Sequence, residues 1–139
     1  MVGGLVFLVD TNVWLELLLE QERAEEVRDF LSTIEPSLLA LTDFTIFSIG
    51  IILTRLGKDQ LFSDFTADTL EQGEVTSLRL NTSDMRDLLA VGQQFRLDFD
   101  DAYQYLAAEK HGFMLVSFDS DFDRTERGRK TPKQIITGF

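Results

Sequence analysis

Three aspartates stand where a folded chain could bring them together around a cation. Asp10 directly follows an apolar run, Asp119 follows a second one, and Asp101 opens a segment of helical pattern between them. Clustered carboxylates repel one another, so keeping several of them ionised requires a compensating cation. Because these groups offer only oxygen ligands, the cation expected is Mg²⁺ or Mn²⁺. Such an ion polarises a phosphoryl oxygen and lowers the pKa of a coordinated water, so phosphodiester hydrolysis would need no histidine base.

The composition excludes several other kinds of site. The 139 residues include 0 cysteines and 1 histidine, which excludes zinc ribbons, thiol nucleophiles and multi-histidine metal sites, and is poorly compatible with a Ser-His-Asp hydrolase. The formal net charge of −11 excludes a uniformly basic nucleic-acid clamp and suits a basic protein partner or a bound cation. The longest apolar stretch is too short to span a bilayer, so we expect a cytoplasmic protein with no membrane attachment.

The elements that must position the aspartates alternate between strand and helix patterns. The apolar run at residues 3–9 predicts a strand buried on both faces and central in its sheet. Further strands are predicted at 38–41, 75–80 and 113–118, with 134–137 as a candidate last strand; helices are predicted at 12–20, 22–34, 43–55, 58–72, from Ser83 to Phe95, and at 100–111. This order predicts an α/β fold: a single domain over residues 1–139, with three α/β/α layers and a mostly parallel central sheet. Ligands of such sheets gather beyond the carboxyl ends of the strands, where the aspartates fall.

Other polar residues near the aspartates have two interpretations. Thr11 and Asn12 could present a hydroxyl and an amide group to the site, or could cap the first helix. A ten-residue stretch after Asp119 carries 5 of the 13 positive charges and could hold a phosphate backbone, although a solvated loop is the alternative. Its basic residues are Arg124, Arg127, Arg129, Lys130 and Lys133.

Taken together, the acidic motifs resemble those of PIN domains, most closely the VapC-like toxins of prokaryotic toxin–antitoxin modules. The matching segments are residues 9–12 (Val-Asp-Thr-Asn), 100–102 (Asp-Asp-Ala) and 115–122, in the order and spacing of that family over nearly the whole chain. The resemblance implies a parallel-sheet α/β/α fold and Mg²⁺- or Mn²⁺-dependent endoribonuclease activity on RNA. It further implies a homodimer, and inhibition by a small antitoxin protein whose tail occupies the site.

Residue by residue, the resemblance assigns Asp10, Asp101 and Asp119 as catalytic, metal-binding acids. Asp121 matches a frequent auxiliary acid, and Ser117 matches the hydroxyl residue that usually precedes the last acid by two positions. One position departs from the family pattern, because Ser48 stands where a glutamate is usual in the helix after the second strand. Asp43 is the acid available in that helix; it could reach the metal or cap the helix, and we favour the cap.

Two alternatives to a nuclease remain open. The first is a PIN-like module that lost its glutamate at position 48, with weakened Mg²⁺ affinity, and now serves protein or RNA binding. The second is a phosphoacceptor receiver domain, which also clusters acids at strand ends. A receiver needs paired acids in its first loop and a lysine after its late strand, and Asp10-Thr11-Asn12 lacks the pair. The receiver is therefore the weaker alternative.

Overall fold

Four parallel strands form the sheet, with the first strand in its interior. The computed structural model describes residues 5–138. Strands β1 (Phe7–Val9), β2 (Leu39–Thr42), β3 (Thr76–Leu78) and β4 (Met114–Val116) lie in the order β3-β2-β1-β4. β1 pairs in parallel with both β2 and β4, and Phe7 lies opposite Leu39 on one side and Met114 on the other. The predicted parallel sheet with a central first strand is confirmed. Gly3 and Gly4 of the predicted strand lie outside the described residues.

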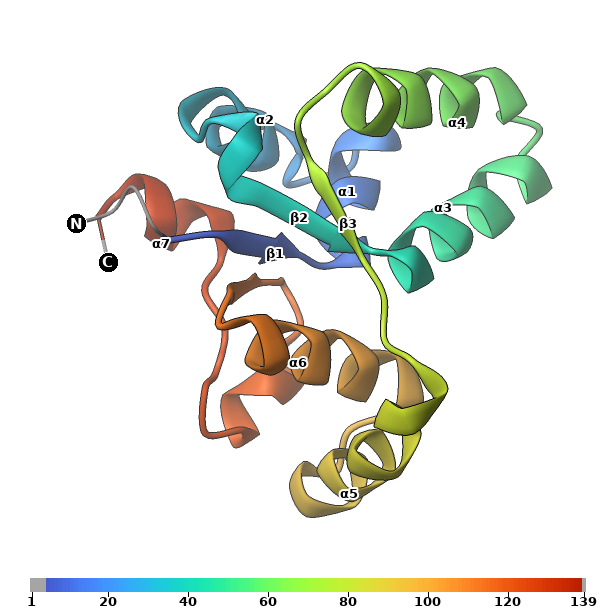
Figure 1. Ribbon diagram of the computed structural model, residues 1–139. Coiled ribbons are helices and arrows are strands. Elements are labelled where there is room, and N and C mark those ends of the chain that lie inside the picture. Colours follow the sequence, from blue (N-terminus) through green and yellow to red (C-terminus); the bar gives the residue numbers. More distant parts are fainter. Residues whose placement is uncertain (1–4, 139) are drawn as a thin grey trace.

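Helices cover both faces of this sheet, which confirms the predicted α/β/α layers (Figure 1). One face is covered by α1 (Thr11–Leu18), α2 (Ala24–Thr33), α3 (Asp43–Arg55) and α4 (Asp59–Thr66), which continues as a π-helical turn (Ala67–Glu71). The other face is covered by α5 (Met85–Phe95) and α6 (Phe99–His111). Short 3-10 helices lie at Pro36–Leu38, Thr82–Asp84 and Ser120–Arg124.

Alternation along β1 divides its side chains between two hydrophobic cores. Leu8 packs toward α5 and α6, whereas Phe7 and Val9 pack toward α1, α2 and α3. All three side chains are buried, as expected for a strand in the interior of a parallel sheet. The apolar first strand is therefore the element on which both helical layers rest.

The sheet winds in two directions from β1, and this places a crevice at the carboxyl ends of β1 and β4. From β1 the chain crosses to β2 and then to β3 on one side, while β4 pairs with the opposite side of β1. Such reversals are where parallel sheets bind ligands. Asp10 follows β1 directly, and Asp119 lies three residues beyond Val116, the end of β4.

The central part of α6 is buried on all sides, and this fixes the orientation of its first turn. Every residue from Ala102 to Ala108 is buried. Gly112 ends the helix in the left-handed conformation with a φ of 70°, so the chain turns sharply into β4. Because the helix is embedded in this way, Asp101 in its first turn is held at the mouth of the crevice.

The predicted last strand at 134–137 is wrong, because those residues belong largely to helix α7 (Pro132–Ile136), which packs against α2. The Thr131 hydroxyl accepts a hydrogen bond from the backbone N–H of Gln134 at 3.2 Å, and the Gln134 side chain accepts one from the Thr131 N–H at 2.8 Å. This reciprocal cap, with Pro132 at the first helical position, starts a helix. The strand-like pairing beyond β4 is a parallel bridge between Val116 and Lys130.

Within residues 5–138, none of the helices combines the length and the apolar character that a membrane crossing would need.

Candidate metal centre

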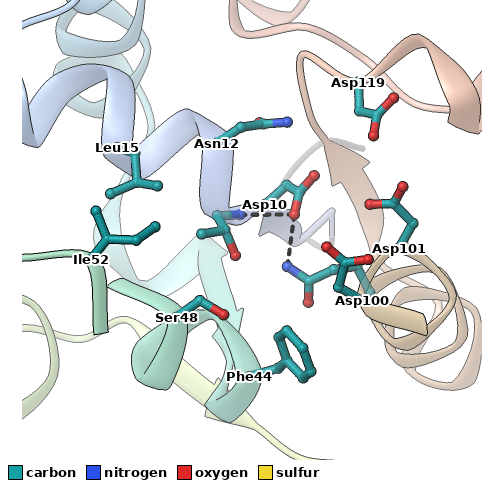
Figure 2. Close-up of a pocket in the computed structure, with 11 residues that line it drawn as sticks. Asp10, Asn12, Leu15, Phe44, Ser48, Ile52, Asp100, Asp101 and Asp119 are labelled. Atoms are coloured by element: carbon teal, nitrogen blue, oxygen red, sulfur yellow. Dashed lines mark hydrogen bonds between the residues drawn. The ribbon is translucent and has the colours of Figure 1, made fainter. Parts of the chain in front are cut away.

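An open pocket of about 330 Å³ lies at the carboxyl ends of β1 and β4. Figure 2 shows Asp10, Asp101 and Asp119 around it, with Ser48 on the other side from Asp119. The pocket is lined by the acids Asp10, Asp100, Asp101 and Asp119, by the polar residues Thr11, Asn12, Ser48 and Gln104, and by the apolar residues Leu15, Phe44 and Ile52. The three principal acids predicted from the sequence therefore line one pocket, although they come from three separate parts of the chain.

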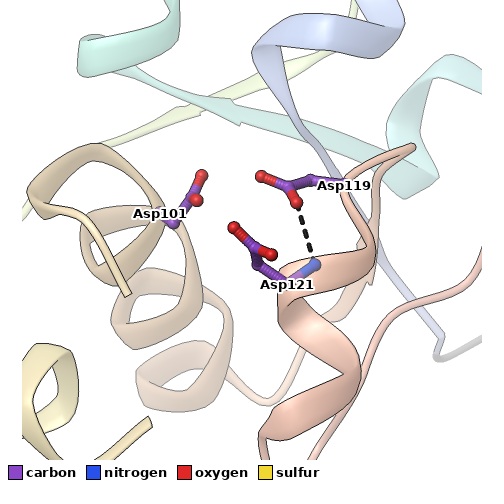
Figure 3. Close-up of side chains that lie close together, drawn as sticks. All are labelled: Asp101, Asp119 and Asp121. Carbon is purple, nitrogen blue, oxygen red and sulfur yellow. Dashed lines mark hydrogen bonds between the residues drawn. The ribbon is translucent and has the colours of Figure 1, made fainter. Parts of the chain in front are cut away.

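The tightest group of carboxylates consists of Asp101, Asp119 and Asp121 (Figure 3). One oxygen from each lies within 4.8 Å of the others. The Asp119 carboxylate accepts a hydrogen bond from the Asp121 backbone N–H at 2.8 Å and so caps the 3-10 helix at Ser120–Arg124. Asp121 also forms an ion pair with Arg124 at 3.0 Å. These groups offer only oxygen donors, which suits a hard divalent cation.

The electrostatics of Asp101 favour a bound cation. Burial raises the pKa of Asp101 to about 8, together with a hydrogen bond to Asp119 and the negative charges of Asp119, Asp100 and Asp10. Neighbouring negative charges destabilise the ionised form of a carboxyl group. A cation that binds among these charges stabilises the ionised form again. The residues at this site therefore fit a divalent ion.

Asp10 is held rigidly at the base of the pocket. Its side chain is only 5% exposed. One carboxylate oxygen accepts hydrogen bonds from the Thr11 backbone N–H at 2.8 Å and from the Gln104 amide at 2.9 Å, and the other accepts one from the Ser117 hydroxyl at 2.7 Å. Burial raises the pKa of Asp10, while the bonds from Gln104 and Ser117 lower it in part. Asp10 is thus a fixed carboxyl group that lines the same pocket as Asp101 and Asp119.

Ser117 connects the ends of β1 and β4. Its hydroxyl accepts hydrogen bonds from the Asp119 backbone N–H at 2.9 Å and from the Asn12 amide at 3.3 Å, while it donates to Asp10. The Asn12 carbonyl oxygen in turn accepts the backbone N–H of Phe118 at 3.2 Å. Ser117 and Asn12, both predicted as auxiliary residues, therefore fix the loop after β4 to the start of α1.

Gln104 is a site residue that sequence reasoning missed. Its buried amide nitrogen donates to Asp10 and, at 2.7 Å, to the hydroxyl of Thr45, and its carbonyl oxygen accepts the Thr42 hydroxyl at 2.7 Å. The Thr45 hydroxyl also lies 2.9 Å from that of Thr11. The sequence held one signal: Gln104 stands three residues after Asp101 and so shares its side of a helix. Asp100, which also lines the pocket, was missed as well.

Asp43 does not line the pocket, and its predicted role as the cap of α3 is wrong. Thr42 is the cap, because its hydroxyl accepts the backbone N–H of Thr45 at 3.1 Å. The Asp43 carboxylate accepts the phenolic hydroxyl of Tyr103 at 2.7 Å and the backbone N–H of its neighbour Phe44 at 2.8 Å. Ser48 does line the pocket, so the position expected to carry a glutamate faces the carboxylates with a hydroxyl group.

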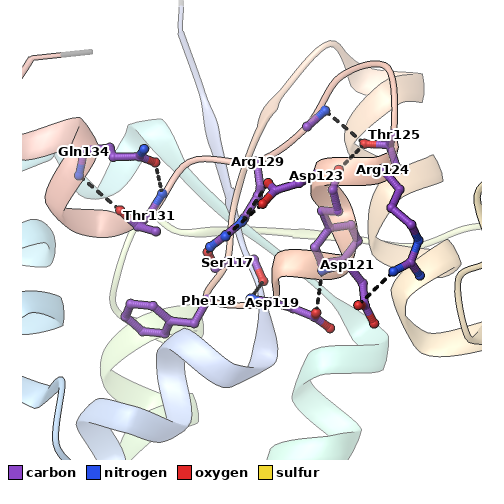
Figure 4. A network of polar contacts seen from close by, with 12 residues as sticks. Ser117, Phe118, Asp119, Asp121, Asp123, Arg124, Thr125, Arg129, Thr131 and Gln134 are labelled. Atoms are coloured by element: carbon purple, nitrogen blue, oxygen red, sulfur yellow. Dashed lines mark hydrogen bonds and ion pairs between the residues drawn. The ribbon is translucent and has the colours of Figure 1, made fainter.

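The arginines of the basic stretch make contacts that hold the loop after β4 (Figure 4). Arg124 donates at 3.0 Å to the carbonyl of the last residue of α5, and Arg127 donates at 2.8 Å to the carbonyl just before β4. Arg129 pairs with both carboxylate oxygens of Asp123, at 3.1 and 3.2 Å. These contacts give the three arginines a structural role, and RNA binding by them and by Lys130 stays a prediction.

Comparison with known proteins agrees with this architecture. The family model for the PIN domain matches residues 7–128. No curated protein matches the sequence. Solved structures with this fold include a toxin–antitoxin complex from Klebsiella pneumoniae (20% identity, TM-score 0.72, covering 90% of this chain and 96% of that one) and the sarcin-ricin loop cleaving toxin VapC20 from Mycobacterium tuberculosis (17% identity, TM-score 0.71, covering 84% and 92%). They also include FitAB bound to a DNA fragment (17% identity, TM-score 0.78, covering 92% and 96%).

Proposed function

Because this chain belongs to the PIN domain family, we propose that it is a divalent-metal-dependent endoribonuclease that hydrolyses RNA phosphodiester bonds. The observation that carries the proposal is the convergence of the Asp101, Asp119 and Asp121 carboxylates, with oxygens within 4.8 Å of one another. Asp10 lines the same pocket, at the edge of the sheet where such folds bind ligands. RNA is preferred to DNA because the three acidic motifs resemble those of VapC-like toxins. The whole chain, residues 1–139, is then one nuclease domain.

In this proposal Asp10, Asp101 and Asp119 hold Mg²⁺ or Mn²⁺, and Asp121 assists them. When bound, such an ion supplies polarisation of a phosphoryl oxygen and activation of a water molecule. The chain itself fixes the ligands: Asp10 is immobilised by three hydrogen bonds, and Asp119 is oriented by the backbone N–H of Asp121. Preorganised ligands need no rearrangement when the substrate arrives, which is where electrostatic catalysis gains most.

Asp101 acts as the group that couples protonation to cation binding. Its pKa of about 8 means that it holds a proton at neutral pH when no cation is present. Asp101 would release that proton when the site holds a divalent ion, so binding would exchange a proton for a cation rather than accumulate negative charge. Asp100, exposed at the pocket mouth, adds to the negative potential that draws the cation in.

We extend the proposal to a protein partner: this chain is the toxin of a VapBC-type pair, and a small antitoxin with a basic, arginine-bearing tail covers the carboxylates. The net charge of −11 and the acidic pocket support a basic partner. Phe47 and Ile51, on one side of α3, are 64% and 51% exposed, which supports a protein interface beside the pocket, either with that antitoxin or in a homodimer. Purifying the chain from its native host with no second protein bound would count against the antitoxin.

One observation favours a second candidate function, a PIN-like module with a weakened site that binds protein or RNA without cleaving it. Ser48 lines the pocket where the family pattern has a glutamate, so the site carries one carboxylate fewer than expected. Less negative charge lowers the affinity for Mg²⁺. Titration calorimetry separates the two candidates: Mn²⁺ or Mg²⁺ binding below millimolar concentration supports the nuclease, and no binding at millimolar metal supports the module.

The nuclease proposal is tested with two single variants, Asp10→Asn and Asp119→Asn, assayed on labelled RNA with added Mn²⁺. Each substitution keeps the shape of the side chain and removes its charge. Asp87→Asn, an exposed carboxylate on α5 outside the pocket, is the matched control. We expect cleavage to fall at least a hundredfold in both site variants and to be unchanged in the control. Equal cleavage by wild type and both site variants, after nuclease-free repurification, rejects the proposal.

A further inference from the structure

A second open pocket, of about 440 Å³, lies beside the metal pocket. It is lined by Asn12, Glu16, Gln21, Glu22, Arg23 and Phe118, which come from α1, from the turn before α2 and from the loop after β4. Asn12 lines both pockets, so the two are adjacent. Asn12 also bonds Ser117 in the acidic site, whereas the other five residues of the second pocket do not line the metal pocket.

The pocket contains a stacked pair of side chains. The guanidinium carbon of Arg23 lies over the Phe118 ring, 4.5 Å from its centroid. The Glu16 carboxylate accepts the backbone N–H of Arg23 at 2.8 Å, which fixes this residue just before α2. Arg23 is exposed, so one face of its guanidinium is covered by the ring while the residue remains accessible to solvent. A planar cation held over an aromatic ring is a surface on which another flat group can stack.

Phe118 is fixed relative to the acidic site. It lies between Ser117 and Asp119 in the chain, and its backbone N–H donates to Asn12 at 3.2 Å. Asn12 donates to Ser117, which donates to Asp10, so a continuous set of hydrogen bonds joins the ring's backbone to the base of the metal pocket. Figure 4 shows the Phe118 ring pointing away from the Asp119 carboxylate, which places the two groups on different sides of the loop. The stacking surface and the carboxylates are thus rigidly related neighbours.

The lining of the second pocket suits a nucleobase better than a phosphate. Two carboxylates, Glu16 and Glu22, would repel a phosphate but can accept hydrogen bonds from the amino and imino groups at a base edge. Gln21 offers both a donor and an acceptor. Bases stack on aromatic rings and on guanidinium planes, and the Arg23–Phe118 pair provides both.

We propose that the Arg23–Phe118 pair is a stacking subsite for one base of a single-stranded RNA whose neighbouring phosphate lies in the metal pocket. This inference rests on the proposed function and deepens it, because it makes the enzyme's preference depend on a base beside the cleaved bond. The base stacks on the outer face of the Arg23 guanidinium, which Phe118 supports from beneath. The carboxylates of Glu16 and Glu22 then contact its edge.

The test is an abasic scan of RNA binding. Fluorescence anisotropy measures the affinity of the full chain for an eight-nucleotide RNA in Ca²⁺, with a gel to verify that the RNA stays intact, and for eight versions that each lack one base. We expect one position at which loss of the base weakens wild-type binding about tenfold, as typical stacking energies predict. That penalty disappears in Arg23→Lys, which keeps the charge but not the plane, and in Phe118→Leu. Phe118→Tyr, which keeps the ring, retains it.

Several results overturn the inference. It fails if no position is penalised, if wild type binds no RNA, or if Arg23→Lys and Phe118→Leu keep the full penalty. It also fails if an arginine-rich hexapeptide binds in a Phe118-dependent way while RNA shows no penalty, since the pocket then belongs to a protein partner. Arg23 is exposed, so its variant remains informative even if Phe118→Leu is unstable. The nuclease proposal fails separately, by cleavage that does not depend on Asp10 and Asp119.

Discussion

Gln104 donates a hydrogen bond to Asp10 at 2.9 Å across 94 residues of sequence, and this bond joins the centre of α6 to the end of β1. The same amide group bonds Thr42 and Thr45 at the start of α3. Three elements that meet at the pocket are therefore fixed to one another by a single buried side chain. The carboxylate that lies deepest in the site depends on a neutral residue for its orientation.

The first prediction concerns that amide. Gln104→Leu removes two donors and one acceptor, so Asp10, Thr42 and Thr45 each lose one buried hydrogen-bond partner, and the free energy of unfolding should fall by about 2 kcal/mol. Loss of the Gln104 bond also raises the pKa of Asp10 further, so cleavage at neutral pH should fall. Urea denaturation measures the first effect. Gln94→Leu, an exposed position on α5, is the control, and equal stability of the two variants would show that the buried amide contributes nothing.

The second prediction concerns pH and the metal-free protein. Unfolded Asp101 titrates near 3.8 and the folded residue near 8, so between these values the folded state binds more protons than the unfolded state. The free energy of unfolding in EDTA should therefore fall as pH rises from about 4 to about 8. Asp101→Asn should flatten this slope, and the exposed control Asp87→Asn should keep it. If the free energy of unfolding of Asp101→Asn falls with pH as steeply as that of wild type, the pKa of Asp101 is not raised.

The third prediction restores the glutamate that the family pattern has at position 48 and that this chain lacks. Ser48 lines the pocket, so Ser48→Glu adds a carboxylate facing the other acids and should tighten Mn²⁺ binding about tenfold or more. In EDTA the same variant should be less stable than wild type, because the added charge is repelled. Ser48→Gln has nearly the same shape without the charge and should change neither quantity in this way. If calorimetry finds equal Mn²⁺ affinity for both variants, Ser48 does not face the metal.

The fourth prediction separates Asp43 from the metal. Asp43→Ala deprives the Tyr103 hydroxyl of its acceptor, so stability should fall by about 1 kcal/mol while Mn²⁺ affinity stays unchanged. The loss should add only in part to that of Tyr103→Phe in a double-mutant cycle, because both substitutions remove the Asp43–Tyr103 bond. Each also removes one bond of its own: Asp43 accepts the Phe44 N–H, and the Tyr103 hydroxyl accepts the Leu80 N–H. A tenfold loss of Mn²⁺ affinity in Asp43→Ala would instead make it a ligand.

Positions in the chain were enough to predict the main geometry of the site. Parallel strands end at a common edge, so acids after the first and last strands lie near each other if those strands are neighbours, as β1 and β4 are. The helix between them then brings in Asp101. The uncharged side chains that bond these aspartates were harder to predict from the sequence. A glutamine in mid-helix is usually exposed, and only the packing of α6 against both α5 and the sheet makes Gln104 a buried hydrogen-bond donor to Asp10.

At two places the sequence carried conflicting signals, and the prediction followed the wrong one. At α7, Thr131 and Gln134 with Pro132 form a helix-start pattern, but the apolar Ile135 and Ile136 suggested a strand. At α3, Thr42 and Asp43 are both good caps, and the end of β2 decides between them. Because β2 continues through Thr42, that residue is the last extended one, and Asp43 already lies in the first turn and reaches Tyr103.

The central claim is that these carboxylates hold a divalent ion, and anomalous diffraction from a crystal soaked in Mn²⁺ tests it most directly. We expect a Mn²⁺ peak in contact with Asp101 and Asp119, with Asp10 or Asp121 completing the carboxylate ligands, and loss of that peak in Asp119→Asn. A fully soaked crystal with no peak in this pocket, or with Mn²⁺ bound only at other carboxylates, would contradict it.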